Sequence, residues 1–98
     1  MAKPEPSEAS IVRRIKTAMK DAGWRVWKNH GSAYSEPGLP DLMAIRNGRF
    51  VAIEVKRPRS GRLSAAQTRW IKKIEEQGHE AIVARSVDDV RHLCDGEQ

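Results

Sequence analysis

The pair Asn47-Gly48 constrains the fold of this chain more than any other feature of its sequence. Asn-Gly is the favoured pair for a type I′ turn, and the apolar runs at residues 42–45 and 50–53 predict the two antiparallel strands of a β-hairpin. A two-residue loop also fixes the register of the strands, because Arg46 must then face Arg49. Every pair farther from the turn follows from that one.

Continued outward, the register brings two carboxylates face to face beside a lysine. Asp41 pairs with Glu54, and their Cβ atoms are expected about 4.5–5.5 Å apart. Lys56 projects from the same face as Glu54, because side chains alternate along a strand. Opposed carboxylates repel unless a cation lies between them, and a hard divalent ion with oxygen ligands is suited to that place. The alternative is three ordinary solvated charges on an open sheet face.

The segment from about Ser7 to Ala22 predicts an amphipathic helix with one acidic residue on its apolar side. The apolar stripe consists of Ile11, Val12, Ile15, Met19 and Ala22. Glu8 falls on this stripe. It either has a partner on that side or is favoured there by the positive end of the helix dipole.

A second helix, from the N-cap residue Ser64 to about Gln77, has the same kind of exception. The stripe that faces inward consists of Leu63, Gln67, Trp70, Ile71 and Ile74. Gln67 is polar but lies on this stripe. Its spacing from Ser64 is that of a capping box, so the sequence leaves two roles open for Gln67, capping and support of a site.

Together these residues resemble the PD-(D/E)xK nuclease superfamily, and within it the small stand-alone form of the VRR-NUC domain, the virus-type replication-repair nucleases. The resemblance rests on Gly38-Leu39-Pro40-Asp41, on Glu54-Val55-Lys56 after the hairpin, and on the helix that carries Gln67. It extends from Glu8 to the strand predicted at residues 81–84. No expected motif residue is missing.

The resemblance implies a metal site. Asp41 and Glu54 would be the principal ligands, the backbone carbonyl of Val55 a further one, and Glu8 would reach the ion directly or through water. Mg²⁺ or Mn²⁺ suits such an all-oxygen set, whereas zinc prefers nitrogen and sulfur ligands. The nitrogen and sulfur candidates are scattered along the chain, at His30, His79, His92 and Cys94.

The resemblance also implies the reaction, which is hydrolysis of a DNA phosphodiester. Lys56 would position or activate the attacking water, and Gln67 would orient Lys56 or that water. Stand-alone members behave like Holliday junction resolvases, so four-way junction DNA is the expected substrate. A domain this small needs two copies to cut two strands, which predicts a symmetric homodimer. The alternatives are a flap or single-strand nuclease, a restriction-type endonuclease, and a non-catalytic nucleic-acid-binding module.

Positive charge is concentrated directly after the candidate site. The formal net charge is +5, and residues 56–73 contain seven basic residues and no acidic one. Besides Lys56 these are Arg57, Arg59, Arg62, Arg69, Lys72 and Lys73. We interpret the last six as DNA-binding residues, because uncompensated like charges repel unless a polyanion is expected. The alternative is a solubilising surface.

A loop at residues 29–38 is long for so small a chain and is a second candidate for substrate contact. Within it, Tyr34 could stack on a base and Glu36 could add a carboxylate.

The predicted order is a helix, a strand at residues 24–28, the hairpin, a helix, a strand at 80–84, and a short helix at 87–93 after Ser86 as N-cap. This is an α/β fold, a restriction-endonuclease-like α-β-β-β-α-β core with a mixed sheet flanked by helices. Ninety-eight residues suffice for a single domain, with flexible tails at 1–6 and 95–98. No secretion signal, transmembrane run or cysteine pair is present, so a cytoplasmic location in a bacterium or a virus-infected host cell is expected.

Overall fold

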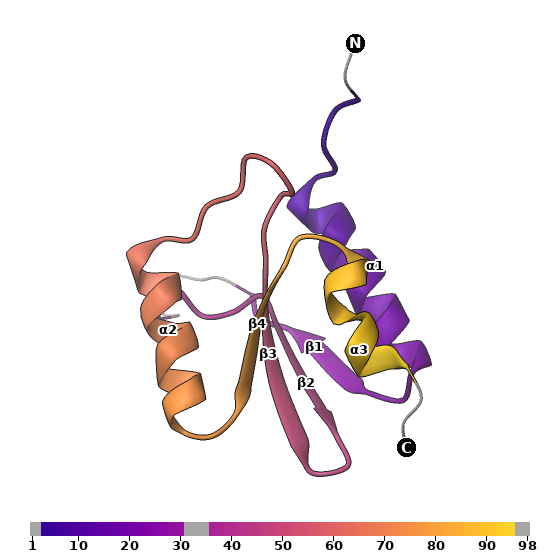
Figure 1. The fold of residues 1–98 in the computed structure, drawn as a ribbon, viewed down its shortest axis with the longest axis vertical. Coiled ribbons are helices and arrows are strands. Elements are labelled where there is room, and N and C mark those ends of the chain that lie inside the picture. The colour runs from indigo at the N-terminus through magenta and orange to yellow at the C-terminus, as the bar shows by residue number, and fades with distance from the viewer. Residues whose placement is uncertain (1–2, 31–35, 96–98) are drawn as a thin grey trace.

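A four-stranded sheet with helices on both of its faces organises the chain (Figure 1). The computed structural model describes residues 3–30 and 36–95. In chain order, its elements are α1 (Glu8–Asp21), β1 (Arg25–Lys28), β2 (Leu42–Arg46), β3 (Arg49–Val55), α2 (Ala65–Glu76), β4 (Glu80–Ala84), the 3-10 helix η1 (Val87–Val90) and α3 (Arg91–Cys94). The strand order is β1-β2-β3-β4, with β3 and β4 parallel and the other neighbours antiparallel. The predicted α/β fold with a mixed sheet is confirmed.

The hairpin between β2 and β3 has the register that the sequence predicts. Arg46 pairs with Arg49 across the turn. Asn47 and Gly48 both have positive φ angles, 49° and 81°, as a type I′ turn requires. Because the turn fixes every further pair, the ends of β2 and β3 farthest from it align as expected, one step short of the two carboxylates.

The two faces of the sheet are covered differently. On one face, α1, η1 and α3 pack against the strands (Figure 1). The strand residues of this core are Val26, Leu42, Ala44, Val51, Ile53, Val55 and Ala84. On the other face, α2 packs on β3 and β4, and Glu54 points to this side because it alternates with Val55. Over β1 and β2 this second face is open, with Trp27 and Ile45 being 41% and 42% exposed.

The C-terminal helical segment differs in detail from its prediction. The predicted helix at residues 87–93 is divided into η1 and α3. Ser86 occupies the N-cap position, but its side chain makes no capping hydrogen bond. The carboxylate of Asp89 instead accepts a hydrogen bond from the backbone N–H of Arg85 at 2.7 Å. Asp89, three residues after Ser86, thus accepts a hydrogen bond from the backbone ahead of the helical segment. Inspection of the cap position alone does not reveal such an interaction, because several nearby side chains can bond to the same backbone groups.

The segment before α1 makes contacts with a distant part of the chain. Glu5 and Pro6 accept hydrogen bonds from Arg57 and Arg59 in the loop after β3. Tyr34, one of the predicted substrate contacts, lies outside the described residues. In the part of the chain that the structure describes, none of the helices is long and apolar enough to cross a membrane.

Candidate active site

Asp41 is held in place at the start of β2 by backbone interactions on both sides. Its carboxylate accepts a hydrogen bond from the backbone N–H of Val55 at 2.7 Å. Its own carbonyl accepts one from the N–H of Asn29 at 2.8 Å, and the Asn29 side chain donates to the carbonyl of Pro40 at 2.7 Å. The hairpin therefore places Asp41 beside the end of β3. Asn29, which the sequence did not single out, holds the backbone at Pro40 and Asp41 in position.

Gly38 explains why a glycine opens the Gly-x-Pro-Asp stretch. Its φ angle is +86°, and a Cβ atom built there would lie 2.4 Å from the carbonyl carbon of Ala66 and 2.8 Å from the backbone nitrogen of Gln67. Only a residue without a side chain fits this contact. The close approach brings the first turn of α2 beside the strands, which places Gln67 within reach of the carboxylates.

Glu54 is the most constrained group of the site. It is 3% exposed, and its Oε2 atom accepts a hydrogen bond from the side-chain amide of Gln67 at 2.9 Å and lies 3.6 Å from the Lys56 ammonium. Its Oε1 atom is buried and has no hydrogen-bond partner among the described residues. Burial, then the charge and the carboxyl group of Asp41, raise the pKa of Glu54 to about 8, and Lys56 opposes this shift. The positive charge of Lys56 therefore does not offset the effects of burial and of Asp41 on this carboxyl group.

Gln67 has both of the roles that the sequence leaves open. Its side-chain oxygen accepts a hydrogen bond from the backbone N–H of Ser64 at 2.9 Å, and the Ser64 hydroxyl accepts one from the Gln67 N–H, which completes the capping box. Its side-chain nitrogen donates to Glu54. One amide thus starts α2 and, with its other end, orients a carboxylate of the site.

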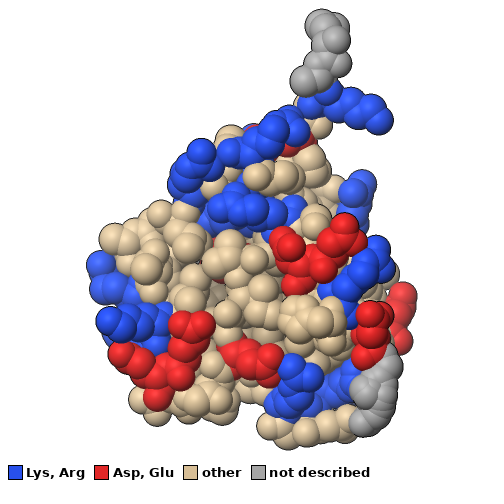
Figure 2. Space-filling model, in the orientation of Figure 1, with Lys and Arg blue, Asp and Glu red and all other residues tan. Residues whose placement is uncertain are grey.

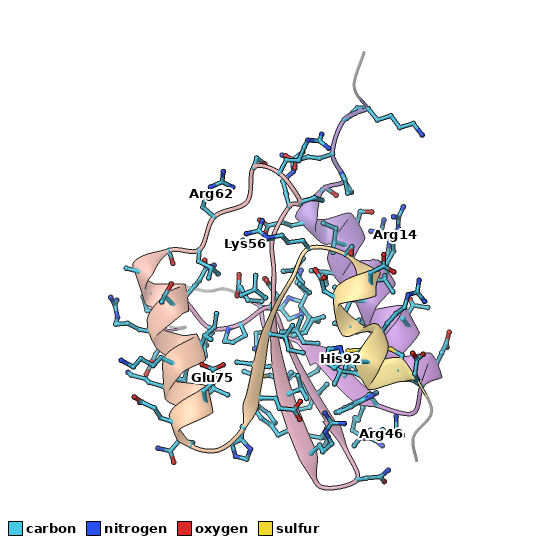
Figure 3. The ribbon with its side chains drawn as sticks, in the orientation of Figure 1. Arg14, Arg46, Lys56, Arg62, Glu75 and His92 are labelled. Atoms are coloured by element: carbon cyan, nitrogen blue, oxygen red, sulfur yellow. The ribbon has the colours of Figure 1, made fainter. Side chains whose placement is uncertain are left out.

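Lys56 continues the line of β3 beyond its last residue. Its backbone N–H donates to the carbonyl of Ala84 at 3.0 Å, which keeps the chain paired with β4 and holds the side chain on the Glu54 face. The residue is only 8% exposed. In Figure 3, Lys56 lies beneath the loop that connects β3 to α2. A buried ammonium beside the Glu54 carboxylate has little freedom to move.

Glu8 does not complete a preformed cluster. Within residues 3–30 and 36–95, no group of three or more His, Cys, Asp or Glu side chains is placed to hold a metal ion. Asp41 and Glu54 are therefore a pair. Glu8 lies in the first turn of α1, on a helix that packs against the opposite face of the sheet. The structure brings together Asp41, Glu54, Lys56 and Gln67, and the role of Glu8 beside them stays a prediction.

The predicted DNA-binding residues fall into two groups. Figure 2 shows Lys and Arg side chains gathered at the top of the view, where Figure 1 places the loop after β3 and the segment before α1. Here Arg57 donates to the carbonyls of Glu5 and Pro6, while Arg62 is exposed and donates to the carbonyls of Arg59 and Gly61. These arginines therefore stabilise the conformation of the loop and also give it a positive charge.

The second basic group lies on α2. Arg69, Lys72 and Lys73 are exposed there, and the Lys73 ammonium is 5.6 Å from the ring centre of Trp70. The same helix carries Gln67, so α2 supplies both this basic group and a residue of the site.

Two residues that matter to this end of the molecule were missed by sequence reasoning. Arg85, just after β4, donates to the carbonyls of Arg57 at 2.8 Å and Gly61 at 3.0 Å and so fixes the loop from below. Ser60 contacts the side chain of Glu5. Neither is part of a short motif. The only sequence signal was a lone acidic residue, Glu5, in a short segment with two prolines.

A paired Asp and Glu at the ends of a hairpin, an adjoining Lys, and a supporting Gln on the next helix define a nuclease domain of the PD-(D/E)xK type. The chain belongs to the VRR-NUC domain family, whose model matches residues 3–88.

Solved structures agree with this assignment. A structure described as a VRR-NUC domain has a TM-score of 0.73 at 24% identity, covering 88% of this chain and 91% of its own. A VRR-NUC domain protein also scores 0.73, at 21% identity, over 94% and 87%. Hjc of Archaeoglobus fulgidus, a Holliday junction resolvase from an archaeal hyperthermophile, scores 0.62 at 26% identity, over 78% and 65%. The first two show the fold alone. No curated protein matches the chain by sequence.

Proposed function

We propose that this protein is a Mg²⁺- or Mn²⁺-dependent endodeoxyribonuclease that cuts branched DNA, four-way junctions above all, as a homodimer. The observation that carries the proposal is the environment of the Glu54 carboxylate. A buried carboxylate beside a second carboxylate, with one oxygen that has no partner among the described residues, is unfavourable in an ordinary protein interior. It becomes favourable when a cation is bound.

The residues fit a hard divalent cation, because the donors gathered here are all oxygen atoms. Asp41, Glu54 and the carbonyl of Val55 would hold it, and Glu8 would contribute from α1 through water. When bound, the ion supplies charge stabilisation at the phosphate and a lowered pKa for a nearby water. Such an all-oxygen set suits Mg²⁺ and Mn²⁺ better than zinc.

The side chains of the protein provide the rest of the chemistry. Lys56 carries a positive charge at a fixed position next to Glu54, so it can stabilise negative charge that develops on a phosphate oxygen and orient the attacking water. Gln67 keeps Glu54 in one orientation while its other end is bound to the cap of α2. Both side chains are positioned before DNA arrives, which avoids reorganisation during the reaction.

The preference for branched DNA is supported by the likeness to Hjc, which is a Holliday junction resolvase. The two basic groups, on the loop after β3 and on α2, offer contacts to phosphates rather than to base edges. Recognition of DNA shape is consistent with such contacts, because they carry no sequence information directly.

The test is cleavage of end-labelled four-way junction, flap, single-stranded and linear duplex DNA with Mg²⁺, Mn²⁺ or EDTA. We expect symmetric metal-dependent nicks in the junction and slower cutting of linear duplex. Cutting confined to flap or single-stranded DNA would retain the chemistry and remove the resolvase assignment. Salt-sensitive DNA binding with no cleavage under any condition would favour the non-catalytic module.

For the homodimer, the open part of the sheet over β1 and β2 is the candidate interface. Trp27 and Ile45 are large, exposed and on the same side, because Trp27 pairs with Met43 and Ile45 follows Met43 by two positions. We expect Trp27→Glu to weaken self-association by roughly 30-fold, about 2 kcal/mol, as buried interface tryptophans do. Sedimentation equilibrium over a range of protein concentrations measures this.

Thr17→Glu is the matched control for that experiment, because Thr17 is exposed on α1, which covers the opposite face of the sheet. It adds the same charge and should leave the dimer intact. Equal masses for Trp27→Glu and the unmodified protein at every concentration would exclude this face as the interface.

A further inference from the structure

The loop after β3 forms a pocket that holds a carboxylate from the other end of the chain. One oxygen of Glu5 accepts hydrogen bonds from the backbone N–H groups of Arg59 at 2.8 Å and Ser60 at 3.2 Å. Its other oxygen is bound by the Ser60 hydroxyl and lies 3.4 Å from the guanidinium of Arg57. The Glu5 side chain is 9% exposed. Two adjacent backbone donors, a hydroxyl and a guanidinium thus converge on one anion.

The shape of this pocket depends on residues other than Glu5. The N–H of Gly61 donates to the carbonyl of Arg57 at 3.2 Å, and Arg85 donates to the carbonyls of both. A Cβ atom at Gly61 would lie 2.6 Å from the backbone nitrogen of Arg57. The loop is therefore tightly closed on itself and anchored to the end of β4, so its donors have fixed directions.

The side chain of Glu5 can leave without undocking the segment that carries it. Arg57 donates to the backbone carbonyls of Pro6 at 3.2 Å and Glu5 at 3.3 Å, and Arg59 donates to the carbonyl of Lys3 at 3.2 Å. These contacts do not involve the carboxylate. Rotation of one side chain would open the pocket.

Backbone N–H groups that point to one place, together with a hydroxyl and a guanidinium, are the donors that proteins use for phosphate oxygens. The first residue of the pocket, Arg57, directly follows Lys56 in the chain, and Figure 3 shows Lys56 beneath the loop that forms the pocket. We propose that this pocket is a binding site for a DNA backbone phosphate, and that Glu5 occupies it in the free protein as an internal mimic of that phosphate. The inference rests on the proposed nuclease function and deepens it.

The chemistry of the occupant agrees with this assignment. The hydrogen bonds from Ser60 and Arg59 lower the pKa of Glu5 to about 2. The carboxylate is therefore ionised at any pH at which the enzyme would act, so DNA must always displace an anion. Such a competitor weakens non-specific DNA binding without altering the active site.

The opposite role for Glu5 is a strut that keeps the loop ordered for DNA. The two roles predict opposite changes in DNA affinity when Glu5 is replaced. If Glu5 competes with phosphate, Glu5→Gln should bind DNA more tightly, because the neutral amide no longer offers the loop an anion. If Glu5 is a strut, Glu5→Gln should bind DNA more weakly.

The experiment is fluorescence anisotropy with labelled four-way junction and linear duplex lacking terminal phosphates, in EDTA so that binding is measured without cleavage. We expect Glu5→Gln to bind both DNAs about 3- to 10-fold more tightly, with a salt dependence steeper by up to about one phosphate contact. Glu75→Gln is the matched control. Glu75 is exposed on α2, away from Lys56 and Arg62 (Figure 3), and its change should have less than a twofold effect.

A second variant keeps the proposal falsifiable. Adding Ser60→Ala to Glu5→Gln removes a pocket donor and should cancel most of the gain in affinity. Unchanged or weaker binding by Glu5→Gln, while the unmodified protein still cuts DNA, would overturn the phosphate pocket and leave the nuclease proposal intact. No DNA binding by either protein would overturn both.

Discussion

Replacing Lys56 with alanine is expected to lower the rate of DNA cleavage by about 10²–10⁴-fold, the range typical for loss of a positioned catalytic group. Lys56 is 8% exposed, and its ammonium lies 3.6 Å from Glu54, so its charge is held beside the carboxylate. Exposed arginines of the neighbouring loop can replace its charge only at longer range. The loss should appear in kcat, measured by single-turnover cleavage of a four-way junction with Mg²⁺, and DNA affinity in EDTA should change by only a few-fold.

Lys20→Ala is the control for that change. Lys20 is exposed at the end of α1, and its replacement removes the same charge without touching the site. Lys56→Arg retains a positive charge but not the compact ammonium, so it should recover only part of the rate. A cleavage rate for Lys56→Ala within threefold of the unmodified protein, with equal folding by circular dichroism, would remove Lys56 from the mechanism.

The hairpin could be predicted to the residue because its information is local. Asn47-Gly48 selects one turn type, the turn fixes the register, and the register aligns the strands that carry Asp41 and Glu54. The start of α2 was predictable for the same reason, since Ser64 and Gln67 form a capping box within four residues. These elements position the carboxylates and the glutamine, so much of the candidate site was within reach of the sequence.

Contacts between distant segments could not be predicted. Glu5 and Ser60 are 55 positions apart, and Arg85 reaches back 28 positions to Arg57. No periodicity or turn signal links such residues, because their meeting depends on how the whole sheet is assembled. The same limit applies to Glu8, because its place on the apolar stripe of α1 does not show whether its side chain reaches the carboxylates.

The sequence left two possible roles for Gln67, because spacing along a helix does not show which residues pack against that helix. The structure shows one side chain with two polar ends, each bound to a different partner. Capping and site support are compatible because the amide has both an acceptor and a donor. A carboxylate at this position could accept from the cap but could not donate to Glu54.

Replacing Glu54 with glutamine is expected to stabilise the metal-free protein at alkaline pH. The pKa of this carboxyl is raised from 4.5 to about 8 by burial and by Asp41. Between these values the folded state keeps a proton that the unfolded state has released, so the stability of the unmodified protein should fall as pH rises from about 4.5 to 8. Glutamine is neutral throughout and can donate to Asp41. At pH 8.5 we expect a gain of about 1–3 kcal/mol, or roughly 5–15 °C in Tm, measured by thermal unfolding in EDTA from pH 5 to 9.

Divalent metal should reverse the order of the two proteins. Mn²⁺ binds the folded state of the unmodified protein and should raise its Tm with metal concentration, whereas Glu54→Gln lacks a principal ligand and should respond weakly. Glu76→Gln, at an exposed position at the end of α2, should follow the unmodified protein in both respects. If Glu54→Gln shows the same fall of stability with pH as the unmodified protein, Glu54 is not the group that titrates. If Mn²⁺ stabilises both proteins equally, the ion does not bind at this carboxylate, and the unpartnered oxygen of Glu54 does not mark a metal site.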